Sequence, residues 1–503
     1  MTIHHLDDVR QGFEDTCDVV VVGSGAGGAV AAANLAAAGL DVILLEAGPQ
    51  LKGADMTRDG PKFMSRYYWE GGMRMILGNN QIPAMAGRCL GGSTVVNSAI
   101  MLKLPDWVRK TWVAEDGLTW LEDAALDRSF ERVFDRLKVA PTPMSVMGKR
   151  NLLTRDILTN AGLDNGPLPR AVHGCAGCCD CITGCASRAK QSVDLNFVPS
   201  AIRDGARVYT CAAVDRVLTE GVRAVGVTGT VIDPIGRRPL AKFTIRAKKV
   251  VLSAGVMATP VILLRSGIHG GRRVGKTLFM HLSCGAVAVM DEPVEPWIGA
   301  TQGWGAISPD IQGLKYESLW APPSLIMVKW GDLGERWLRQ IQDARNICLI
   351  ALVYRGQCKG RVRARRDGTP LPTLWVPRHE IHTLMRGLKV VVDSMLDMGV
   401  RFVNTGVVGC PNEIRTPADA ETLLSPRIKA GDVDMTGNHV FGSCRMSADP
   451  KRGPVDLEGR VRGVEGLYVM DGSICPNGTA VNPQATIMAM SDVLSRRLGE
   501  LTV

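Results

Sequence analysis

A segment of alternating apolar and glycine-rich character, DVVVVGSGAGGAVAAANLAAAGLDVILLE, ends at Glu46 and constrains the fold more than any other part of the chain. The apolar run 19–22 predicts a buried strand. A run of small residues over 29–38 predicts a helix, and the apolar run 42–45 predicts a second strand. Strand, helix and strand in this order predict the start of a Rossmann-like α/β domain.

Three glycines between the first strand and the helix form the pattern G-x-G-x-x-G. Gly23 permits the tight turn, Gly25 lets the backbone approach a pyrophosphate, and Gly28 lets helix and strand pack closely. The start of the helix offers free N–H groups and a positive dipole end to the phosphates. Glu46 can accept hydrogen bonds from an adenosine ribose. The segment predicts a dinucleotide site, NAD or FAD, and the alternative is glycine-rich packing with no ligand.

A second unusual stretch, HGCAGCCDCITGCASRAKQS over 173–192, concentrates thiols at one place. Its spacing C-x2-C-x2-C-x3-C is that of bacterial ferredoxins, with Ala186 in place of the usual proline. A thiol cluster in a reducing compartment favours metal binding over disulfides. The alternatives are an iron–sulfur cluster ([3Fe-4S] or [4Fe-4S]), a structural zinc ion, and metal-free thiols. The candidate metal ligands are Cys175, Cys178, Cys179, Cys181 and Cys185.

The bulk properties exclude several classes of protein. The chain of 503 residues is long enough for two or more domains or for one large discontinuous assembly. Its hydrophobic content of 46% is enough for a sizeable core. No uninterrupted apolar run approaches the roughly eighteen residues of a membrane span, and the first residues lack a signal-peptide pattern, so we expect a cytoplasmic protein without a transmembrane segment. A net charge of +9 without an aromatic-interleaved basic stripe argues against a nucleic-acid partner.

Further motifs carry a family resemblance. The chain reads GRCLGGSTVVNSAIMLKLP from Gly87, KKVVLSAGVMATPVILLRSGI over 248–268, VGKTLFMHL over 274–282, and NHVFGSCRM from Asn438. With the N-terminal fingerprint, these motifs resemble the glucose–methanol–choline (GMC) family of FAD-dependent oxidoreductases.

This resemblance implies an α/β, GMC-type fold that is discontinuous in sequence. A Rossmann-like FAD-binding domain is expected from residues 1–105, 190–290 and 436–503. A sheet-based substrate domain is expected from 106–189, which contains the cysteine-rich segment 173–192, and from 291–435.

The resemblance also implies two catalytic residues. His439, in HVFGSCRM, matches the family's catalytic histidine, which takes the hydroxyl proton of an alcohol while the carbinol hydride leaves for flavin N5. Asn482, in AVNPQ, matches a second position that hydrogen-bonds the substrate oxygen. A competing interpretation makes Asn482 the N-cap of a helix over 485–498, with Pro483 at its first position. The positive end of that helix would stabilise the reduced flavin.

Other matched positions are expected to contact the cofactor. Asp471 corresponds to an acidic residue near the flavin phosphate and ribitol, and Val214 could meet the adenine through its backbone. Val96 occupies the position at which some relatives carry a histidine bound covalently to flavin, so we expect non-covalent FAD. The expected cofactor-binding residues are Gly23, Gly25, Gly28, Glu46, Gly91, Gly92, Ser93, Asn97, Val214, Asp471 and Pro483.

The cysteine-rich stretch resembles those of long-chain alcohol oxidases and of the bacterial FAD glucose dehydrogenase, which holds a [3Fe-4S] cluster. The resemblance therefore implies an alcohol dehydrogenase that produces an aldehyde or ketone and passes electrons through an iron–sulfur cluster to an acceptor protein or quinone. The alternatives are an oxidase that reduces oxygen to peroxide, a non-redox lyase, and a non-catalytic electron-transfer or binding subunit. Several tryptophans could line a pocket for a lipophilic alcohol or form a core; they are Trp297, Trp304, Trp320, Trp330 and Trp337.

Overall fold

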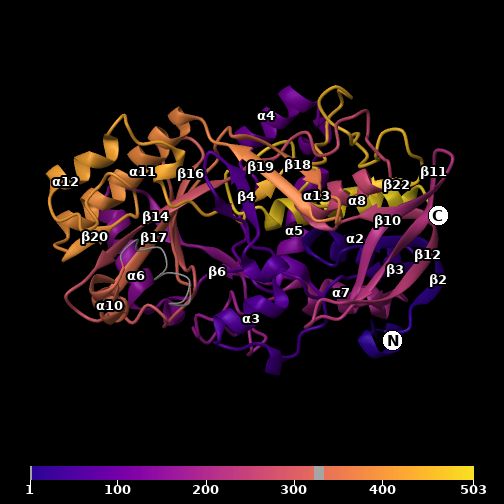
Figure 1. The fold of residues 1–503 in the computed structure, drawn as a ribbon, viewed down its shortest axis with the longest axis horizontal. Coiled ribbons are helices and arrows are strands. Elements are labelled where there is room, and N and C mark those ends of the chain that lie inside the picture. The colour runs from indigo at the N-terminus through magenta and orange to yellow at the C-terminus, as the bar shows by residue number, and fades with distance from the viewer. Residues whose placement is uncertain (1–2, 322–332, 503) are drawn as a thin grey trace.

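The computed structural model describes residues 3–321 and 333–502, arranged as two sheet-based halves side by side (Figure 1). The half that contains both termini is built on an eight-stranded sheet in which β22 (Leu467–Val469) pairs with β12. The order of the other strands is β1 (Ile3–His4), β9 (Arg207–Tyr209), β3 (Val42–Leu45), β2 (Phe13–Val22), β12 (Pro239–Leu252), β11 (Arg223–Ile232) and β10 (Ala212–Glu220).

The central strands of this sheet are parallel, as the predicted strand–helix–strand unit requires. β2 pairs in parallel with both β3 and β12, whereas β10, β11 and β12 form an antiparallel meander. The predicted strands 19–22 and 42–45 correspond to the buried end of β2 and to β3. The predicted helix is α2 (Ala26–Ala37). The α/β class predicted for this part of the chain is confirmed.

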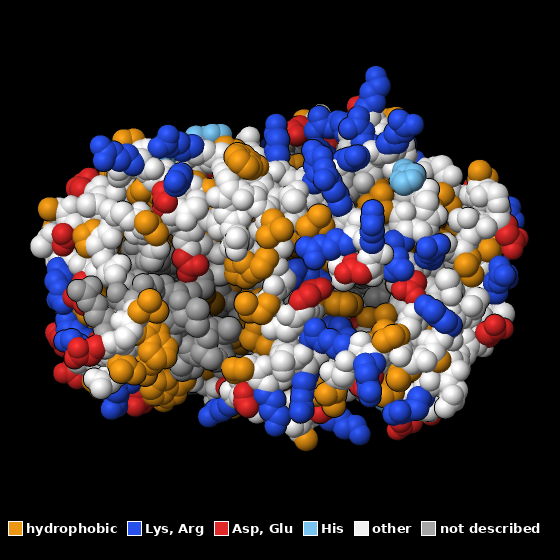
Figure 2. Space-filling model, viewed as in Figure 1, with side chains coloured by type: hydrophobic (Ala, Val, Ile, Leu, Met, Phe, Trp, Pro, Cys, Tyr) orange, Lys and Arg blue, Asp and Glu red, His pale blue; other side chains and the backbone are white. Residues whose placement is uncertain are grey.

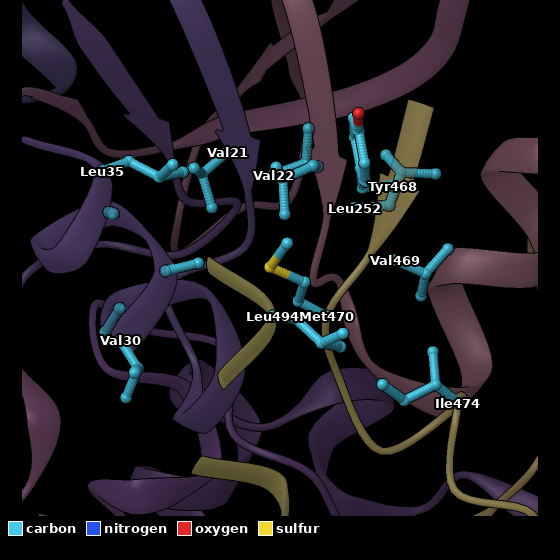
Figure 3. Close-up of a cluster of buried hydrophobic side chains, with 14 of the residues drawn as sticks. Val21, Val22, Val30, Leu35, Leu252, Tyr468, Val469, Met470, Ile474 and Leu494 are labelled. Carbon is cyan, nitrogen blue, oxygen red and sulfur yellow. The ribbon is translucent and has the colours of Figure 1, made fainter. Parts of the chain in front are cut away.

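The core of this half lies between the sheet and two helices, α2 and α13 (Gln484–Glu500). Figure 3 shows side chains from the sheet strands meeting those of the helices, among them Val22, Leu252 and Leu494. Small residues along α2 allow α13 to approach closely, and Ser491 Oγ donates to the carbonyl oxygen of Gly27 at 2.7 Å. Other helices of this half are α5 (Ala124–Arg136), α7 (Phe197–Arg203) and α8 (Gly255–Arg265).

The other half is built on a six-stranded antiparallel sheet. Its order is β20 (Phe402–Asn404), β14 (Leu282–Val289), β17 (Ile347–Tyr354), β16 (Leu314–Ser318), β15 (Trp304–Ile307) and β7 (Asn165–Pro167). The helices of this half are α6 (Gly148–Asn160), α10 (Glu335–Gln342), α11 (Arg378–Asp397) and α12 (Pro417–Glu421). The buried face of α11 packs against the sheet, as its apolar side chains belong to the same core as those of β14 and β17.

A smaller four-stranded sheet lies between the halves in Figure 1 and joins distant segments. It consists of β18 (Lys359–Ala364), β19 (Pro370–Trp375), β4 (Met75–Gly78) and β5 (Ile82–Pro83). Shorter elements are α1 (Leu6–Val9), α3 (Gly60–Tyr67), α4 (Asp106–Asp116), β6 (Val139–Pro141), β8 (Pro169–Ala171), β13 (Phe279–Met280) and β21 (Val440–Phe441).

The predicted division of the chain differs from the observed packing at three places. α5, from the predicted substrate segment 106–189, packs in the half with the eight-stranded sheet, where Ser129 Oγ donates to Asp492 Oδ2 at 2.7 Å. β14, placed within the predicted FAD segment 190–290, belongs to the six-stranded sheet, because its neighbours are β17 and β20. β4, from the predicted segment 1–105, pairs with β19 from 291–435. All strands of the eight-stranded sheet come from the three segments predicted for the FAD domain.

The tryptophans of the second half do not form one pocket lining. Trp304 and Trp320 are buried, Trp297 is 40% exposed, and Trp337 is partly buried. Trp330 lies outside the described residues. On the face in Figure 2, Lys and Arg side chains are interspersed with acidic and apolar ones and form no continuous basic stripe. Within residues 3–321 and 333–502, no helix is long and apolar enough to cross a membrane.

Candidate active site

The glycines of the fingerprint occupy the positions that a dinucleotide site requires. Gly23 has a left-handed φ of +98° at the turn after β2, and a side chain at Gly28 would meet the carbonyl oxygen of Gly23 at 1.8 Å. Gly25 is the N-cap of α2, and a Cβ there would meet nothing within 4 Å. This open space at the start of a helix fits a phosphate group, so the residues present suit a dinucleotide such as FAD.

Glu46 joins the fingerprint to the second glycine turn. Its carboxylate accepts hydrogen bonds from Ser24 Oγ at 2.5 Å and from the Gly48 N–H at 2.8 Å. Burial raises the pKa of Glu46, and these hydrogen bonds oppose the rise. Ser24 Oγ in turn accepts from the Gly91 N–H at 2.9 Å. A Cβ on Gly92 would lie 3.0 Å from Gly25 Cα, so the two predicted glycine turns are packed against each other.

Two further predicted cofactor residues, Val214 and Asp471, lie close to the N-terminal fingerprint. Val214 is in β10, two residues after Ala212, whose N–H donates to the carbonyl oxygen of Glu46 at 2.8 Å. The backbone of Asp471 lies against Gly27 at the start of α2. The Asp471 carboxylate accepts from the Gly255 N–H at 2.8 Å and from Thr259 Oγ1 at 2.6 Å. It therefore holds the first turns of α8, and its contact with cofactor stays a prediction.

Asn97 contacts the start of α13. Asn97 Nδ2 donates to Gln484 Oε1 in the first turn of α13. Ser93 Oγ, in the glycine turn, accepts from the Gly87 N–H at 3.1 Å. Pro483 is the N-cap of α13 and provides no side-chain hydrogen bond to it. The first N–H groups of a 17-residue helix are therefore not capped by a side chain.

His439 is bonded to a second histidine that the sequence analysis did not single out. His439 Nδ1 lies 3.2 Å from His281 Nδ1, and His281 Nε2 accepts from the Ala480 N–H at 3.1 Å. Burial lowers the pKa of His439 to about 4; the Glu317 carboxylate opposes this shift, and the Lys315 ammonium group adds to it. Burial likewise holds the pKa of His281 well below its ordinary value. Both rings are therefore neutral near pH 7.

This chain of bonds determines the tautomer of each ring. Because a backbone N–H can only donate, His281 Nε2 is an acceptor and the proton of neutral His281 is on Nδ1. His281 then donates to His439 Nδ1, so the proton of His439 is on Nε2. Nε2 is the ring nitrogen of His439 that remains available to a substrate.

Asn482 is bonded to the six-stranded sheet and not to the helix that follows it. Its Oδ1 accepts from Lys315 Nζ, which also donates to Glu317 Oε2 at 2.6 Å. Lys315 and Glu317 alternate along β16, so they project from the same face of the strand. Both are almost completely buried. The interpretation of Asn482 as the side-chain cap of α13 is wrong, because the cap residue is Pro483.

The loop that carries Asn482 is held by contacts from other elements. Arg355, which follows β17, donates from Nε to the Gly478 carbonyl oxygen at 2.6 Å and from Nη2 to Asn477 Oδ1 at 2.7 Å. Trp112 Nε1, from α4, donates to the same Asn477 oxygen at 2.6 Å. The loop is thus supported from both halves of the molecule.

The five predicted metal ligands line one pocket but do not form a metal centre. Within the described part of the chain, no group of three or more His, Cys, Asp or Glu side chains is arranged to hold a metal ion. The pocket is lined by residues that include Cys175, Cys178, Cys179, Cys181, Cys185, Arg170, Lys190 and Thr301. The predicted iron–sulfur or zinc ligand set is therefore not supported.

Individual thiols in this pocket have protein partners instead. Cys181 Sγ accepts from Arg170 Nη2 at 3.2 Å, and Cys179 Sγ lies 3.7 Å from Arg150 Nη2. Burial raises the pKa of Cys179 to about 11, although Arg150 opposes it. Burial also disfavours the Cys181 thiolate, but the charges of Arg170 and Lys190 outweigh it and lower the pKa. The sulfurs of Cys181 and Cys179 thus each lie within hydrogen-bonding distance of an arginine.

Sequence reasoning missed His281, Lys315 and Glu317. The signal for the last two was available, since two opposite charges at alternate positions of a strand share one face. Nothing local to LKYES indicated that this face would be buried against Asn482. His281 lies in the quoted motif VGKTLFMHL, but its partner is 158 residues away.

Comparison with known proteins agrees with this architecture. The GMC oxidoreductase family models match residues 18–283 and 357–491. A GMC-type oxidoreductase of Mycobacterium tuberculosis, Rv0492c, is 34% identical over 480 residues, which are 94% of this chain and 74% of that protein. The long-chain-alcohol oxidase FAO4B of Arabidopsis thaliana is 28% identical over 98% of this chain and 68% of its own length.

Solved structures show the same fold at low identity. Pyridoxine 4-oxidase from Mesorbium loti superposes with a TM-score of 0.69 at 19% identity, covering 96% of this chain and 99% of that one. A formate oxidase superposes with a TM-score of 0.71 at 15% identity, covering 96% and 98%. The predicted family and fold are confirmed: this chain belongs to the GMC oxidoreductase family and is an FAD-dependent oxidoreductase.

Proposed function

We propose that this protein oxidises an alcohol to the aldehyde or ketone, with His439 and Asn482 meeting the substrate oxygen. The observation that carries this proposal is the chain of bonds from His439 through His281 to Ala480, two residues before Asn482. These bonds link the two predicted catalytic residues and leave one polar atom of each, His439 Nε2 and Asn482 Nδ2, for a ligand.

The chain's own residues would then act on the hydroxyl group. Asn482 Nδ2 donates to the substrate oxygen and stabilises the negative charge that develops on it. His439 Nε2 accepts the hydroxyl proton as a general base. FAD, when bound along the fingerprint and the glycine turn of Gly91 and Gly92, supplies the acceptor for the carbinol hydride at N5.

The tautomer of His439 that carries its proton on Nε2 adds a free-energy cost to its role as a base. Nε2 of His439 can accept a proton only after the His439–His281 pair exchanges tautomers, which leaves the Ala480 N–H without an acceptor. An unsatisfied buried donor costs about 1–3 kcal/mol. General base catalysis contributes about 10²–10⁴-fold, or roughly 3–5 kcal/mol. The exchange also leaves the new His281 Nε2–H without an acceptor, so the total cost is of the same order as the catalytic gain.

A lipophilic alcohol is the proposed substrate class. The similarity to long-chain-alcohol oxidases over almost the whole chain supports this choice. Trp297, which is 40% exposed and packs on the buried Trp320 with ring centroids 6.2 Å apart, offers an apolar surface in the six-stranded half. Non-covalent FAD is proposed because Val96 offers no nucleophile for a bond to flavin.

Oxygen, reduced to peroxide, is the proposed electron acceptor. The prediction of a dehydrogenase depended on an iron–sulfur route, and the described cysteines are not arranged as a metal centre. Relatives that match over most of this chain carry names of oxidases, namely long-chain-alcohol oxidase and choline oxidase.

The test is anaerobic mixing of the holoprotein with primary alcohols of increasing chain length. Bleaching of the oxidised flavin band is expected, fastest for long chains, followed by one peroxide per flavin when air is admitted. His439→Gln should slow bleaching by about 10²–10⁴-fold. Bleaching without peroxide would favour the dehydrogenase with a protein or quinone acceptor. Failure of every alcohol to bleach the flavin would overturn the proposal and favour a non-redox lyase.

A further inference from the structure

The amide of Asn482 has two chemically different ends, and only one of them suits the reaction. Its Oδ1 is an acceptor and its Nδ2 carries two donors. An oxygen that gains negative charge requires the donor end. The two ends have almost the same shape, so packing alone discriminates poorly between an amide that presents Nδ2 and one that presents Oδ1.

Lys315 resolves this choice because an ammonium group can only donate. It donates to Asn482 Oδ1, so the acceptor end of the amide is turned toward β16. Nδ2 then faces away from Lys315. The same bond keeps Oδ1 from capping α13, whose N-cap is Pro483.

Glu317 provides the counter-ion of Lys315. Lys315 and Glu317 are 1% and 3% exposed, and their charged atoms are 2.6 Å apart. An ammonium group paired with a carboxylate is only a donor, so it distinguishes the acceptor end of the amide from the donor end.

Burying the Lys315–Glu317 pair costs desolvation free energy, so stability alone does not explain it. β16 is buried along its whole length, and apolar residues at 315 and 317 would avoid the desolvation of two charges. The hydrogen bond from Lys315 to Asn482 indicates that the pair has a functional role at this site.

We propose that Lys315, held by Glu317, is a positioning residue that orients the Asn482 amide so that Nδ2 donates to the substrate oxygen. This inference rests on the proposed alcohol oxidation. It concerns the orientation of one side chain and adds no step to the reaction.

The test is a double-mutant cycle on the holoenzyme, read as the limiting rate of anaerobic flavin reduction by an alcohol that the wild type oxidises. Lys315→Met/Glu317→Leu removes both charges together, which avoids leaving one of them buried and unpaired. This variant and Asn482→Ala should each lower the limiting rate by roughly 10²-fold, the effect of removing one oxyanion donor. Combined, they should lower it little further, because both remove the same interaction.

Further variants separate orientation from general damage. Lys315→Arg keeps a pure donor and should recover part of the rate. Lys389→Met breaks a remote lysine–aspartate pair on α11, with charged atoms 2.6 Å apart, and should leave the rate unchanged. Flavin content and the thermal unfolding midpoint, measured on each variant, identify any loss that comes from misfolding. The substrate dissociation constant should change much less than the rate.

Two outcomes would overturn the inference. One is a wild-type rate in Lys315→Met/Glu317→Leu, and the other is a combined loss equal to the product of the separate losses. Both require an active wild type, so they leave the proposed function standing. A wild type that no alcohol reduces would overturn the proposed function and this inference together.

Discussion

Burial lowers the pKa of His439 to about 4, and the rate of alcohol oxidation should reflect this value. A base must be unprotonated, so kcat/KM should stay flat from pH 8 down to about pH 5 and fall only near pH 4. An unperturbed histidine would instead lose activity below about pH 6.5. Stopped-flow flavin reduction across this range, with flavin retention checked at each pH, measures the profile. An acid limb centred near pH 6.5 would contradict the buried, neutral ring.

The lowered pKa of His439 also makes the stability of the protein depend on pH. The folded-state pKa of His439 is below its unfolded value, so the unfolded chain binds the proton more readily. Below about pH 6.5, the free energy of unfolding therefore falls as the pH decreases, until both states are protonated below about pH 4. His281 contributes in the same direction because burial also lowers its pKa.

The turn between β2 and α2 gives a matched pair of glycine substitutions. A Cβ on Gly28 would collide with the Gly23 carbonyl oxygen, whereas a Cβ on Gly25 would meet nothing within 4 Å. Gly28→Ala should lower the free energy of unfolding of the apoprotein by about 1–3 kcal/mol, as overpacking does. Gly25→Ala should leave that stability unchanged and weaken FAD binding by at least about tenfold, since the phosphate needs this space.

Urea unfolding and flavin titration separate the two effects. Equal loss of stability in both variants would show that Gly25 serves packing. Unchanged FAD affinity in Gly25→Ala would place the phosphate elsewhere.

The cysteine-rich segment gives a prediction about metal content. Because the described cysteines form no ligand set, protein purified without oxygen should contain flavin and only traces of iron and zinc. Its visible spectrum should show flavin bands alone, and treatment with a chelator should leave flavin reduction by alcohol unchanged. Stoichiometric iron with absorption beyond the flavin bands would mean that the sulfurs rearrange to bind a cluster.

A buried ion pair connects segments that are far apart in the whole molecule. Asp116, at the end of α4, accepts from Arg445 Nε at 2.8 Å and from Arg445 Nη2 at 2.6 Å. The Asp116 side chain is completely buried and that of Arg445 is 10% exposed. Asp116→Ala would remove the buried carboxylate that Arg445 shares with Arg452 and leave both with only the half-exposed Glu115, which should lower the free energy of unfolding by about 3–5 kcal/mol.

Asp7→Ala is the matched control, because Asp7 pairs with Arg10 on the surface and its side chain is 92% exposed. Exposed pairs contribute about 0–1 kcal/mol. Chemical denaturation of both variants provides the comparison. A loss below about 1 kcal/mol for Asp116→Ala would show that water reaches the Arg445 charge.

Local physical rules made much of this protein predictable. The strands and the helix around Gly23, Gly25 and Gly28 follow from apolar runs and from the space that glycine leaves, both readable within a few residues. The motifs around His439 and Asn482 were instead identified through the family resemblance. Whether the cysteines form a ligand set was not predictable, because spacing along the chain does not determine how the sulfurs face one another.

Only the packed sheets decided how the candidate active site is oriented. Lys315 and Asn482 are 167 residues apart, and their hydrogen bond exists because the face of β16 meets the loop before α13. His281 and His439 meet for the same reason, and their bonds assign the tautomer of each ring. A short motif encodes which side chains are present and the local backbone shape. The directions of their hydrogen bonds depend on partners that only tertiary packing brings within about 3 Å.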